Sequence, residues 1–308
     1  MCQTAVEMAE PSGKSQRPRV LWTRGRGCRE LAELLGGGET ARVQGDPAKA
    51  CIDERADLLV ARRLSSFDLV DTVVPIDVDP AGVGSVVAAV AGGPHSVLAA
   101  RVARDLGKSL NVEASMVSAY QTGGDAEAAV GVVEEIYPQV PDIEYRTLEA
   151  MDMSDLVANL PEHTLLVFGA PGGSWFQRRV FGPGARLRSH APAGAVVVQS
   201  APERVFQVMG EPVFVAPLLQ AGDTLRIRPE SMLAVADAGR LVGLVRRSRL
   251  LELAPLTPVG QAMEDPVSIG HAEPVTAAQP LRPLFGLDPI PVIDEVENLV
   301  GGLAPPAA

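Results

Sequence analysis

The chain has 308 residues, of which 46% are hydrophobic and 21% charged, so it can build sizeable cores and lacks the composition of a disordered protein. Its formal net charge of −11 at pH 7 argues against a nucleic-acid partner, because such a surface needs clustered positive charge. The 3 cysteines and 4 histidines are scattered, which predicts neither a disulfide scaffold nor a metal site. With no apolar run of membrane-spanning length and no signal-peptide core, we expect a cytoplasmic protein.

The first part of the chain predicts a polar tail and a small α/β lobe. Residues 1–16 are polar and are expected to be disordered. From residue 17 to residue 80, short apolar runs alternate with segments of helical spacing. The expected strands are 19–22, 40–43, 57–61 and 72–76, and the expected helices are 29–35 and 47–55. This lobe resembles no family that we recognise.

Residues 81–200 repeat the alternation more clearly and predict a doubly wound, mainly parallel α/β sheet. The expected strands are 85–90, 114–119, 142–146, 164–168 and 195–199. The expected helices are 95–106, 125–135 and 153–160, with partial helix over 180–190. The stretch 95–106 places Leu98, Val102 and Leu106 on one helical face.

The last third of the chain, residues 201–304, contains an internal duplication. Met209-Gly210-Glu211-Pro212-Val213 is echoed by Met263-Glu264-Asp265-Pro266-Val267. Each copy ends in two apolar runs that flank a polar turn, which predicts a strand–turn–strand exit. These runs are 233–236 and 241–245 in the first copy and 290–293 and 299–303 in the second. We expect the two copies to pack as one globule, because neither buries its apolar face alone.

This repeated pattern, an opening Met-x-x-Pro-Val and a closing Leu-Val-Gly, resembles the cystathionine-β-synthase-type (CBS) module. The resemblance implies a CBS pair that binds an adenosyl ligand between its modules and forms a homodimer. The family commonly holds the ribose with an acid placed three residues after a Ser or Thr. Here that position is Arg249 in the first copy, and the second copy, which continues Gly302-Leu303-Ala304-Pro305, has no acid after its Leu-Val-Gly motif. Arg246 and its neighbours either bind phosphate or form a solvated edge.

A glycine-rich stretch follows the strand expected at 164–168. Such a loop lets backbone N–H groups approach phosphates. Together with the turn at Gly92, its placement resembles the ATP-binding type of universal stress protein over residues 85–199. The resemblance implies ATP or another adenine nucleotide as the ligand, and we expect the loop arginines to favour an anion. The candidate binding residues are Gly92, Gly169, Gly172, Gly173, Gly182, Arg178 and Arg179, with Arg246 of the CBS pair.

Two departures from that family remove polar contacts. Ala91 stands where the family usually has an acid at the end of the first strand. Pro183, which has no N–H to donate, stands where it usually has Ser or Thr. The alternative interpretation is a loop whose glycines only let helix and sheet pack.

No pattern in the chain predicts catalysis. There is no local Ser/His/Asp motif and no paired-carboxylate signature, and Cys28, beside arginines at a helix start, has no evident base partner. We therefore expect a non-enzymatic stress-response regulator that binds an adenine nucleotide and transmits its state through the CBS pair. The alternative is a scaffold with decayed nucleotide sites that binds a partner protein, such as a transporter or an enzyme.

Overall fold

The computed structural model describes residues 19–37, 39–64, 66–121, 124, 126–151, 153–170 and 193–306. The expected tail and the segment 180–190 lie outside the described residues. The chain forms two compact units that are interleaved in sequence. Unit 1 comprises Met1–Arg42, Val60–Arg62 and Val74–Val197, and unit 2 comprises Val43–Leu59, Arg63–Val73 and Val198–Ala308. Within the described ranges, no helix is long and apolar enough to cross a membrane.

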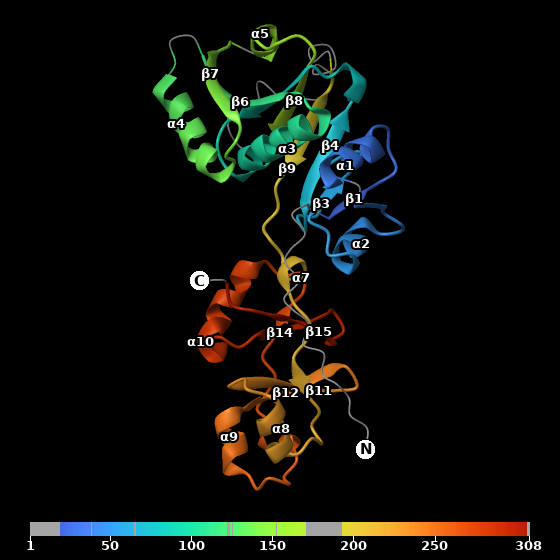
Figure 1. Cartoon of the computed structure of the whole chain (residues 1–308), viewed down its shortest axis with the longest axis vertical. Coiled ribbons are helices and arrows are strands. Elements are labelled where there is room, and N and C mark those ends of the chain that lie inside the picture. The colour runs from blue at the N-terminus through green and yellow to red at the C-terminus, as the bar shows by residue number, and fades with distance from the viewer. Residues whose placement is uncertain are drawn as a thin grey trace. The chain divides into compact units, whose positions relative to one another are not determined.

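A large, mostly parallel sheet of nine strands dominates the first two thirds of the chain (Figure 1). Its strand order is β2-β1-β3-β4-β9-β8-β5-β6-β7. The strands are β1 (Val20–Trp22), β2 (Thr40–Arg42), β3 (Leu58–Val60), β4 (Asp71–Ile76), β5 (Ser85–Val90), β6 (Glu113–Tyr120), β7 (Glu144–Glu149), β8 (Thr164–Gly169) and β9 (Ala195–Gln199). The pairs β1–β2, β5–β6, β5–β8 and β6–β7 are parallel.

The strands β5 to β9 have the spatial order 3-2-1-4-5 when numbered along the chain, which is a doubly wound arrangement. The sheet does not stop there, because β9 is followed by β4, β3, β1 and β2. This corrects the expectation of a separate N-terminal lobe: the strands on both sides of residue 80 join one sheet. Sequence periodicity identified the strands but carries no information about which edges pair.

The helices that cover this sheet are held by apolar contacts. Helix α3 (Pro94–Leu110) packs on β5, β6 and β8 and also contacts α1 (Cys28–Gly36) and α4 (Ala126–Ile136), so the three share one face (Figure 1). The predicted face of α3 is confirmed, since Leu98, Val102 and Leu106 are buried. Other helical segments among the described residues include α5 (Met153–Ala158) and the short 3-10 helices η1 (Pro80–Gly82) and η2 (Tyr137–Gln139).

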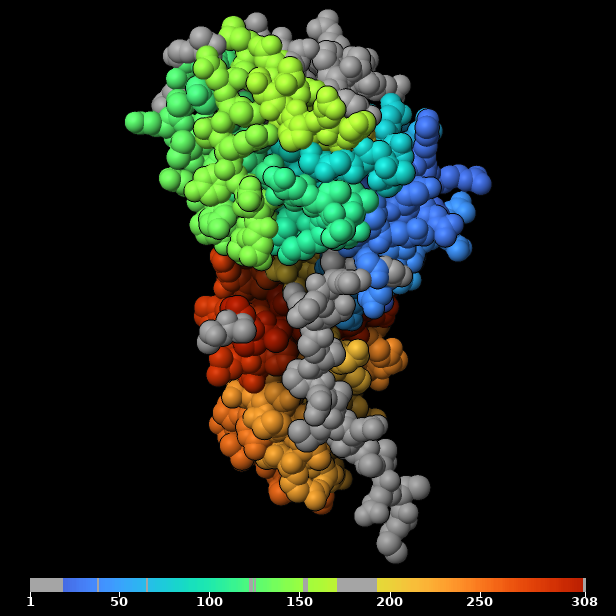
Figure 2. All heavy atoms as spheres, turned by 45° about the horizontal axis from the view of Figure 1, so that its top comes forward, coloured from blue at the N-terminus to red at the C-terminus, as the bar shows by residue number. Residues whose placement is uncertain are grey.

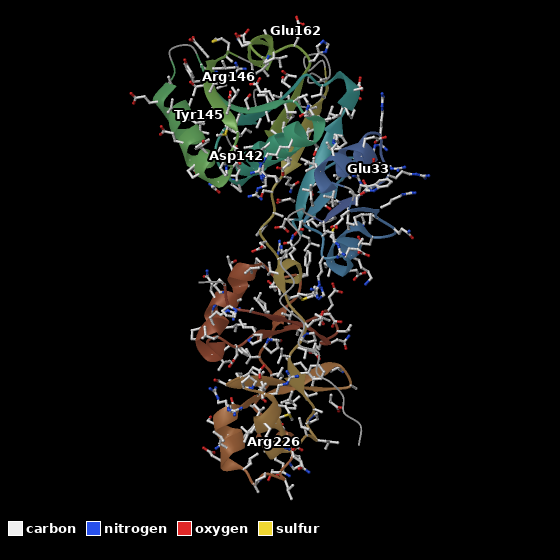
Figure 3. The ribbon with its side chains drawn as sticks, viewed as in Figure 1. Glu33, Asp142, Tyr145, Arg146, Glu162 and Arg226 are labelled. Carbon is white, nitrogen blue, oxygen red and sulfur yellow. The ribbon has the colours of Figure 1, made fainter. Side chains whose placement is uncertain are left out.

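The edge strand β7 is polar rather than apolar. Its residues Tyr145 and Arg146 are exposed (Figure 3). The ring of Tyr145 meets that of Tyr137 edge to face, with 5.3 Å between the ring centroids. Charged side chains along an edge strand discourage pairing with other chains. The structure places this strand at Glu144–Glu149, later than the 142–146 that we expected.

Unit 2 contains two modules of the same topology, which confirms the duplication. The first contains α7 (Val205–Val208), β10 (Phe214–Val215), α8 (Ala221–Ile227), β11 (Met232–Asp237), β12 (Arg240–Arg246) and α9 (Arg247–Glu252). The second contains η4 (Val259–Ala262), β13 (Ile269–Gly270), η5 (Val275–Leu281), α10 (Arg282–Phe285), β14 (Ile290–Ile293) and β15 (Leu299–Leu303). In each, the short strand pairs parallel to a hairpin that carries a bulge at the same place.

The two modules share a core. One cluster of buried side chains joins Val205, Met232 and Leu244 of the first module to Ile269 and Val292 of the second. On the surface the modules form adjacent patches (orange and red in Figure 2). Because of this shared core, we expect that a single copy would not fold on its own.

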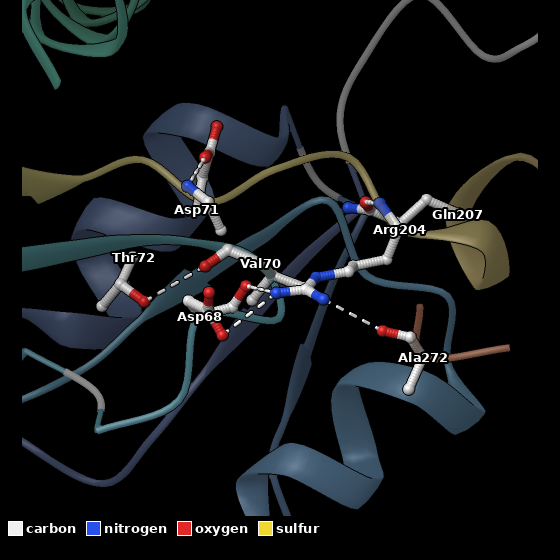
Figure 4. Close-up of polar contacts among 8 residues, drawn as sticks. Asp68, Val70, Asp71, Thr72, Arg204, Gln207 and Ala272 are labelled. Carbon is white, nitrogen blue, oxygen red and sulfur yellow. Dashed lines mark hydrogen bonds and ion pairs between the residues drawn. The ribbon is translucent and has the colours of Figure 1, made fainter. Parts of the chain in front are cut away.

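Two N-terminal segments, 43–59 and 63–73, belong to unit 2 as well. Arg204 donates to the backbone oxygen of Asp68 (2.8 Å), forms an ion pair with its carboxylate (3.0 Å) and reaches the oxygen of Ala272 (3.2 Å; Figure 4). Gln207 donates to the oxygen of Ala56 (3.0 Å). The expected boundary at residue 80 therefore does not separate the compact units, since helix α2 (Pro47–Asp53) groups with the two modules of unit 2.

Candidate nucleotide-binding sites

The first candidate site lies in unit 1, where the direction of chain connection reverses between β5 and β8. In open α/β sheets, ligands bind beyond the carboxyl ends of the strands at such a point. Ala89 pairs with Phe168, so the turn at Gly92 and the end of β8 at Gly169 meet at one edge of the sheet. The strand register therefore brings together two of the glycines that we named as candidate binding residues.

The turn after β5 is fixed by Ser96, which is buried. The Ala91 N–H donates to its hydroxyl (3.0 Å), and the hydroxyl donates to the oxygen of Gly92 (2.9 Å). Gly92 has φ 90°, a conformation that favours glycine. At Gly169 a side chain is excluded, because a Cβ would lie 2.7 Å from the Cβ of His95. Glycine here brings the end of β8 against the first turn of α3.

This turn offers few donors to a phosphate. Pro94, the first residue of α3, has no N–H, and the N–H groups of Ser96 and Val97 both donate to the oxygen of Gly93. Three of the first four helical positions therefore offer no unbonded N–H group to an anion. The other predicted residues of this site, Gly172, Gly173, Arg178, Arg179 and Gly182, lie outside the described residues.

The second candidate site lies in unit 2, where the opening segment of each module pairs with the last strand of the other module. Gly210 of the first module forms two backbone hydrogen bonds with Gly302 of the second (2.9 and 3.1 Å). Glu264 of the second module forms two with Leu244 of the first (2.8 and 3.1 Å). The two motifs that define the repeat, Met-x-x-Pro-Val and Leu-Val-Gly, therefore meet between modules rather than within one.

This pairing between the modules depends on the glycine of each Leu-Val-Gly motif. A Cβ on Gly301 would lie 2.8 Å from Met209 Sδ and 2.9 Å from the oxygen of Gly210. A Cβ on Gly243 would lie 2.8 Å from the oxygen of Glu264 and 3.2 Å from Met263 Sδ. The same contact thus occurs twice, which makes two equivalent junctions between the modules.

The predicted phosphate ligand Arg246 lies at the junction that Gly243 and Leu244 form with Glu264. Its Nε donates to both carboxylate oxygens of Glu264 (3.0 and 3.3 Å), and both side chains are partly exposed. Arg247 donates to backbone oxygens of Arg228 and Leu225, and Arg249 pairs with Glu252. The guanidinium that we expected at a phosphate therefore has a carboxylate partner, which an anionic ligand would have to displace.

Two acids near this junction escaped the sequence analysis. Asp288 accepts hydrogen bonds from the backbone of Ser231 (2.9 Å) and Met232 (2.8 Å), so it ties the second module to the start of β11. Glu230, beside Ser231, has a buried oxygen without a hydrogen-bond partner in the structure as described. A buried, unpaired acceptor is an uncommon feature that a ligand hydroxyl or amine would satisfy. Only tertiary structure reveals either role.

Cysteine and metal chemistry receive no support from the described residues. Cys28 is buried, and burial raises its thiol pKa; Glu30 raises it further and the hydrogen bond with Thr23 lowers it, with a net rise. This is the reverse of an activated thiol. No group of three His, Cys, Asp or Glu side chains within the described ranges lies close enough together to hold a metal ion.

Among solved structures, the chain is similar to CBS domain pairs over about a third of its length. No family model and no curated protein sequence matches the chain. Among solved structures, the cytosolic domain of the Mg²⁺ channel MgtE in complex with ATP matches 33% of this chain and 45% of its own, with a TM-score of 0.30 and 23% identity.

Two further solved structures give the same alignment length. A CBS domain pair/ACT domain protein from Thermotoga maritima matches 33% of this chain and 88% of its own, with a TM-score of 0.31 and 20% identity. CBSX2 in complex with AMP matches 33% and 89%, with a TM-score of 0.29 and 24% identity. None of these comparisons tests the resemblance of residues 85–199 to universal stress proteins, which stays a prediction.

Proposed function

We propose that this protein is a cytosolic regulator, rather than an enzyme, whose CBS-type pair binds an adenine nucleotide at the junction between its modules. The observation that supports the proposal most directly is the junction itself. Arg246 is the last residue of β12 in the first module, Glu264 lies in the opening motif of the second, and the two side chains form an ion pair between the modules. A ligand bound there contacts both modules and therefore favours one arrangement of them.

The chemistry of the junction suggests how a nucleotide would act. A guanidinium binds phosphate oxygens through a planar fork, so phosphate would compete with Glu264 for Arg246. The unpaired oxygen of Glu230 would accept a hydrogen bond from a ribose hydroxyl or an adenine amine, replacing the acid that is absent at Arg249. Binding would thus exchange a link between modules for a link to the ligand, which is a route from ligand to conformation.

The test is titration of the full chain with AMP, ADP and ATP, followed by calorimetry and by thermal denaturation. We expect stabilisation at millimolar nucleotide. Arg246→Gln should weaken binding, and Glu264→Gln should strengthen it by releasing the guanidinium. Arg240→Gln is the matched control, because Arg240 also pairs with a glutamate, Glu297, but does so at the hairpin turns. The absence of any thermal shift with all three nucleotides would refute the proposal.

We propose the same ligand class for the crevice at Gly92 and Gly169 in unit 1, with a universal-stress-type role in stress response. The strand order and the close approach of β8 to α3 support a ligand crevice there. Nucleotide binding that survives Arg246→Gln but is lost on Gly169→Val would assign the nucleotide to this crevice. A homodimer, as the CBS resemblance implies, would be seen directly by analytical ultracentrifugation.

The second candidate function is a scaffold for a partner protein. It is favoured by the pairing of Arg246 with Glu264 and of Arg249 with Glu252, because both guanidinium groups are already neutralised. The scarcity of donors in the first turn of α3 points the same way. A stoichiometric partner, such as a transporter or an enzyme, that is retained with and without nucleotide would favour this function over the first.

A further inference from the structure

A second cavity in unit 2 lies apart from the junction of Arg246 and Glu264. Its volume is about 760 Å³, within the range of about 300–1,000 Å³ that is typical of small-molecule sites. One wall comes from helix α2 and Leu69, and the other from the loops that follow β13 and β14. All the lining residues belong to the same compact unit. Met209 and Val300 contribute apolar surface.

The two walls are held together by direct contacts. Arg55, at the end of α2, donates to the backbone oxygen of Met209 (2.9 Å). Both residues line the cavity, so the cavity bridges the N-terminal segment and the modules at a point where they are hydrogen-bonded. A ligand here would contact both parts at once.

The lining of the cavity is net acidic. The carboxylates are Asp46, Asp53, Asp294 and Glu295, against the two cations Lys49 and Arg55. Both cations already have partners. Lys49 forms an ion pair with Asp53 at 3.5 Å, and Arg55 donates a hydrogen bond to the backbone oxygen of Met209. Glu295 has no partner within the described part of the chain, so its charge is available to a ligand.

Asp294 keeps its charge at neutral pH. Burial alone would raise its pKa, but hydrogen bonds from the side chain and backbone of Asn298 and the backbone of Val296, together with nearby His271, lower it below the usual value. Asp294 therefore contributes a negative charge to this wall at neutral pH.

His271 adds a polar ring to the lining of the cavity. It is 9% exposed, its charge interacts with that of Asp294, and its ring has no hydrogen-bond partner among the described residues. The imidazole nitrogens can therefore donate or accept a hydrogen bond with a molecule that enters the cavity.

We propose that this cavity binds a small organic cation, an ammonium or guanidinium group carried on an apolar body. The carboxylates attract the positive charge, His271 accepts or donates a hydrogen bond, and the apolar surface at Met209 and Val300 receives the body of the ligand. A bare metal ion does not fit, because no three metal-ligating side chains converge among the described residues. A nucleotide is disfavoured by the sign of the lining charge.

The experiment is isothermal calorimetry of the full chain with agmatine and with 1,4-diaminobutane, each compared with 1,4-butanediol, which has the shape of the diamine without its charges. We expect both amines to bind and the diol not to. Glu295→Lys should weaken binding by about tenfold or more, since it reverses one lining charge. Ala48→Trp should abolish binding by filling the cavity from α2.

Two matched variants separate the site from general effects. Glu273→Lys makes the same charge change in the same module outside the cavity, and Ala50→Trp adds the same bulk to the same helix outside it. Both should bind the amines like the wild type. The proposal is overturned if neither amine binds, if the diol binds equally well, or if the lining and control variants behave alike. AMP binding that is lost on Glu295→Lys would also overturn it, by making this a nucleotide site.

Discussion

Substitution of Gly301 by alanine tests whether the two modules are joined as described. The added Cβ would lie 2.8 Å from Met209 Sδ and 2.9 Å from the oxygen of Gly210. Ordinary carbon contacts begin near about 3.5 Å, so roughly 0.6 Å of separation is lacking. The Met209 side chain can rotate away, but the backbone oxygen cannot move without disturbing the two hydrogen bonds between Gly210 and Gly302.

The expected cost follows from either way of relieving the clash. Overpacking costs about 1–3 kcal/mol, and weakening two hydrogen bonds costs about 0.5–1.5 kcal/mol each. We therefore expect Gly301→Ala to lower the free energy of unfolding by about 2 kcal/mol. Gly243→Ala, which meets the oxygen of Glu264 at 2.8 Å, should cost a similar amount.

Gly210→Ala is the control, because it lies in the same ladder and its Cβ would meet only the oxygen of Gly302, at 3.9 Å. This variant should be neutral or slightly stabilising. Urea denaturation followed by circular dichroism gives the stability, and hydrogen exchange of the β12 and β15 peptides locates the effect. Equal stabilities for Gly301→Ala, Gly210→Ala and the wild type would refute the proposed junction.

Four other outcomes follow from the structure. Gly131→Ala, with open space around it in the interior of α4, should stabilise unit 1 by about 0.5–1 kcal/mol in thermal denaturation. Burial raises the pKa of Cys51 to about 12, so peptide mass spectrometry should find it unlabelled by iodoacetamide at pH 8 in the folded protein and labelled in urea. The lowered pKa of Asp294 stabilises the fold above the unfolded-state pKa, so the stability difference between the wild type and Asp294→Asn should shrink as pH falls below about 4. Arg204→Met removes charged hydrogen bonds to two backbone oxygens and should destabilise unit 2 by about 2–4 kcal/mol in urea denaturation, while Asp68→Asn, on an exposed partner, should cost under about 1 kcal/mol.

The strands that the sequence predicted best are those whose pattern is set by burial. The bounds 85–90, 195–199, 290–293 and 299–303 are confirmed as β5, β9, β14 and β15. Each is a short apolar run ended by turn residues, and such a run has few alternatives. The strand β7 was displaced because it reads Glu-Tyr-Arg-Thr-Leu-Glu, an edge sequence in which half of the side chains are charged and burial gives little signal.

The candidate sites divide in the same way. Gly92 and Gly169 could be named from the sequence because both lie where an apolar run ends, and the doubly wound order brings those strand ends together. Glu230, Asp288 and His271 were not, since their significance depends on partners that are distant in sequence or missing altogether. Asp288, for example, meets the backbone of Ser231 across 57 residues, and no local pattern encodes that pairing.

The interleaving of the two units bears on whether the modules can fold without the N-terminal segments. The chain passes between the units after Arg42, Leu59, Arg62, Val73 and Val197. A fragment starting at Val198 would therefore keep both modules but lose Asp68 and Ala56, the partners of Arg204 and Gln207. The guanidinium of Arg204, 11% exposed in the intact protein, would then keep only its bond to Ala272. Because a buried charge without its partner is strongly destabilising, the N-terminal segments are structural parts of unit 2.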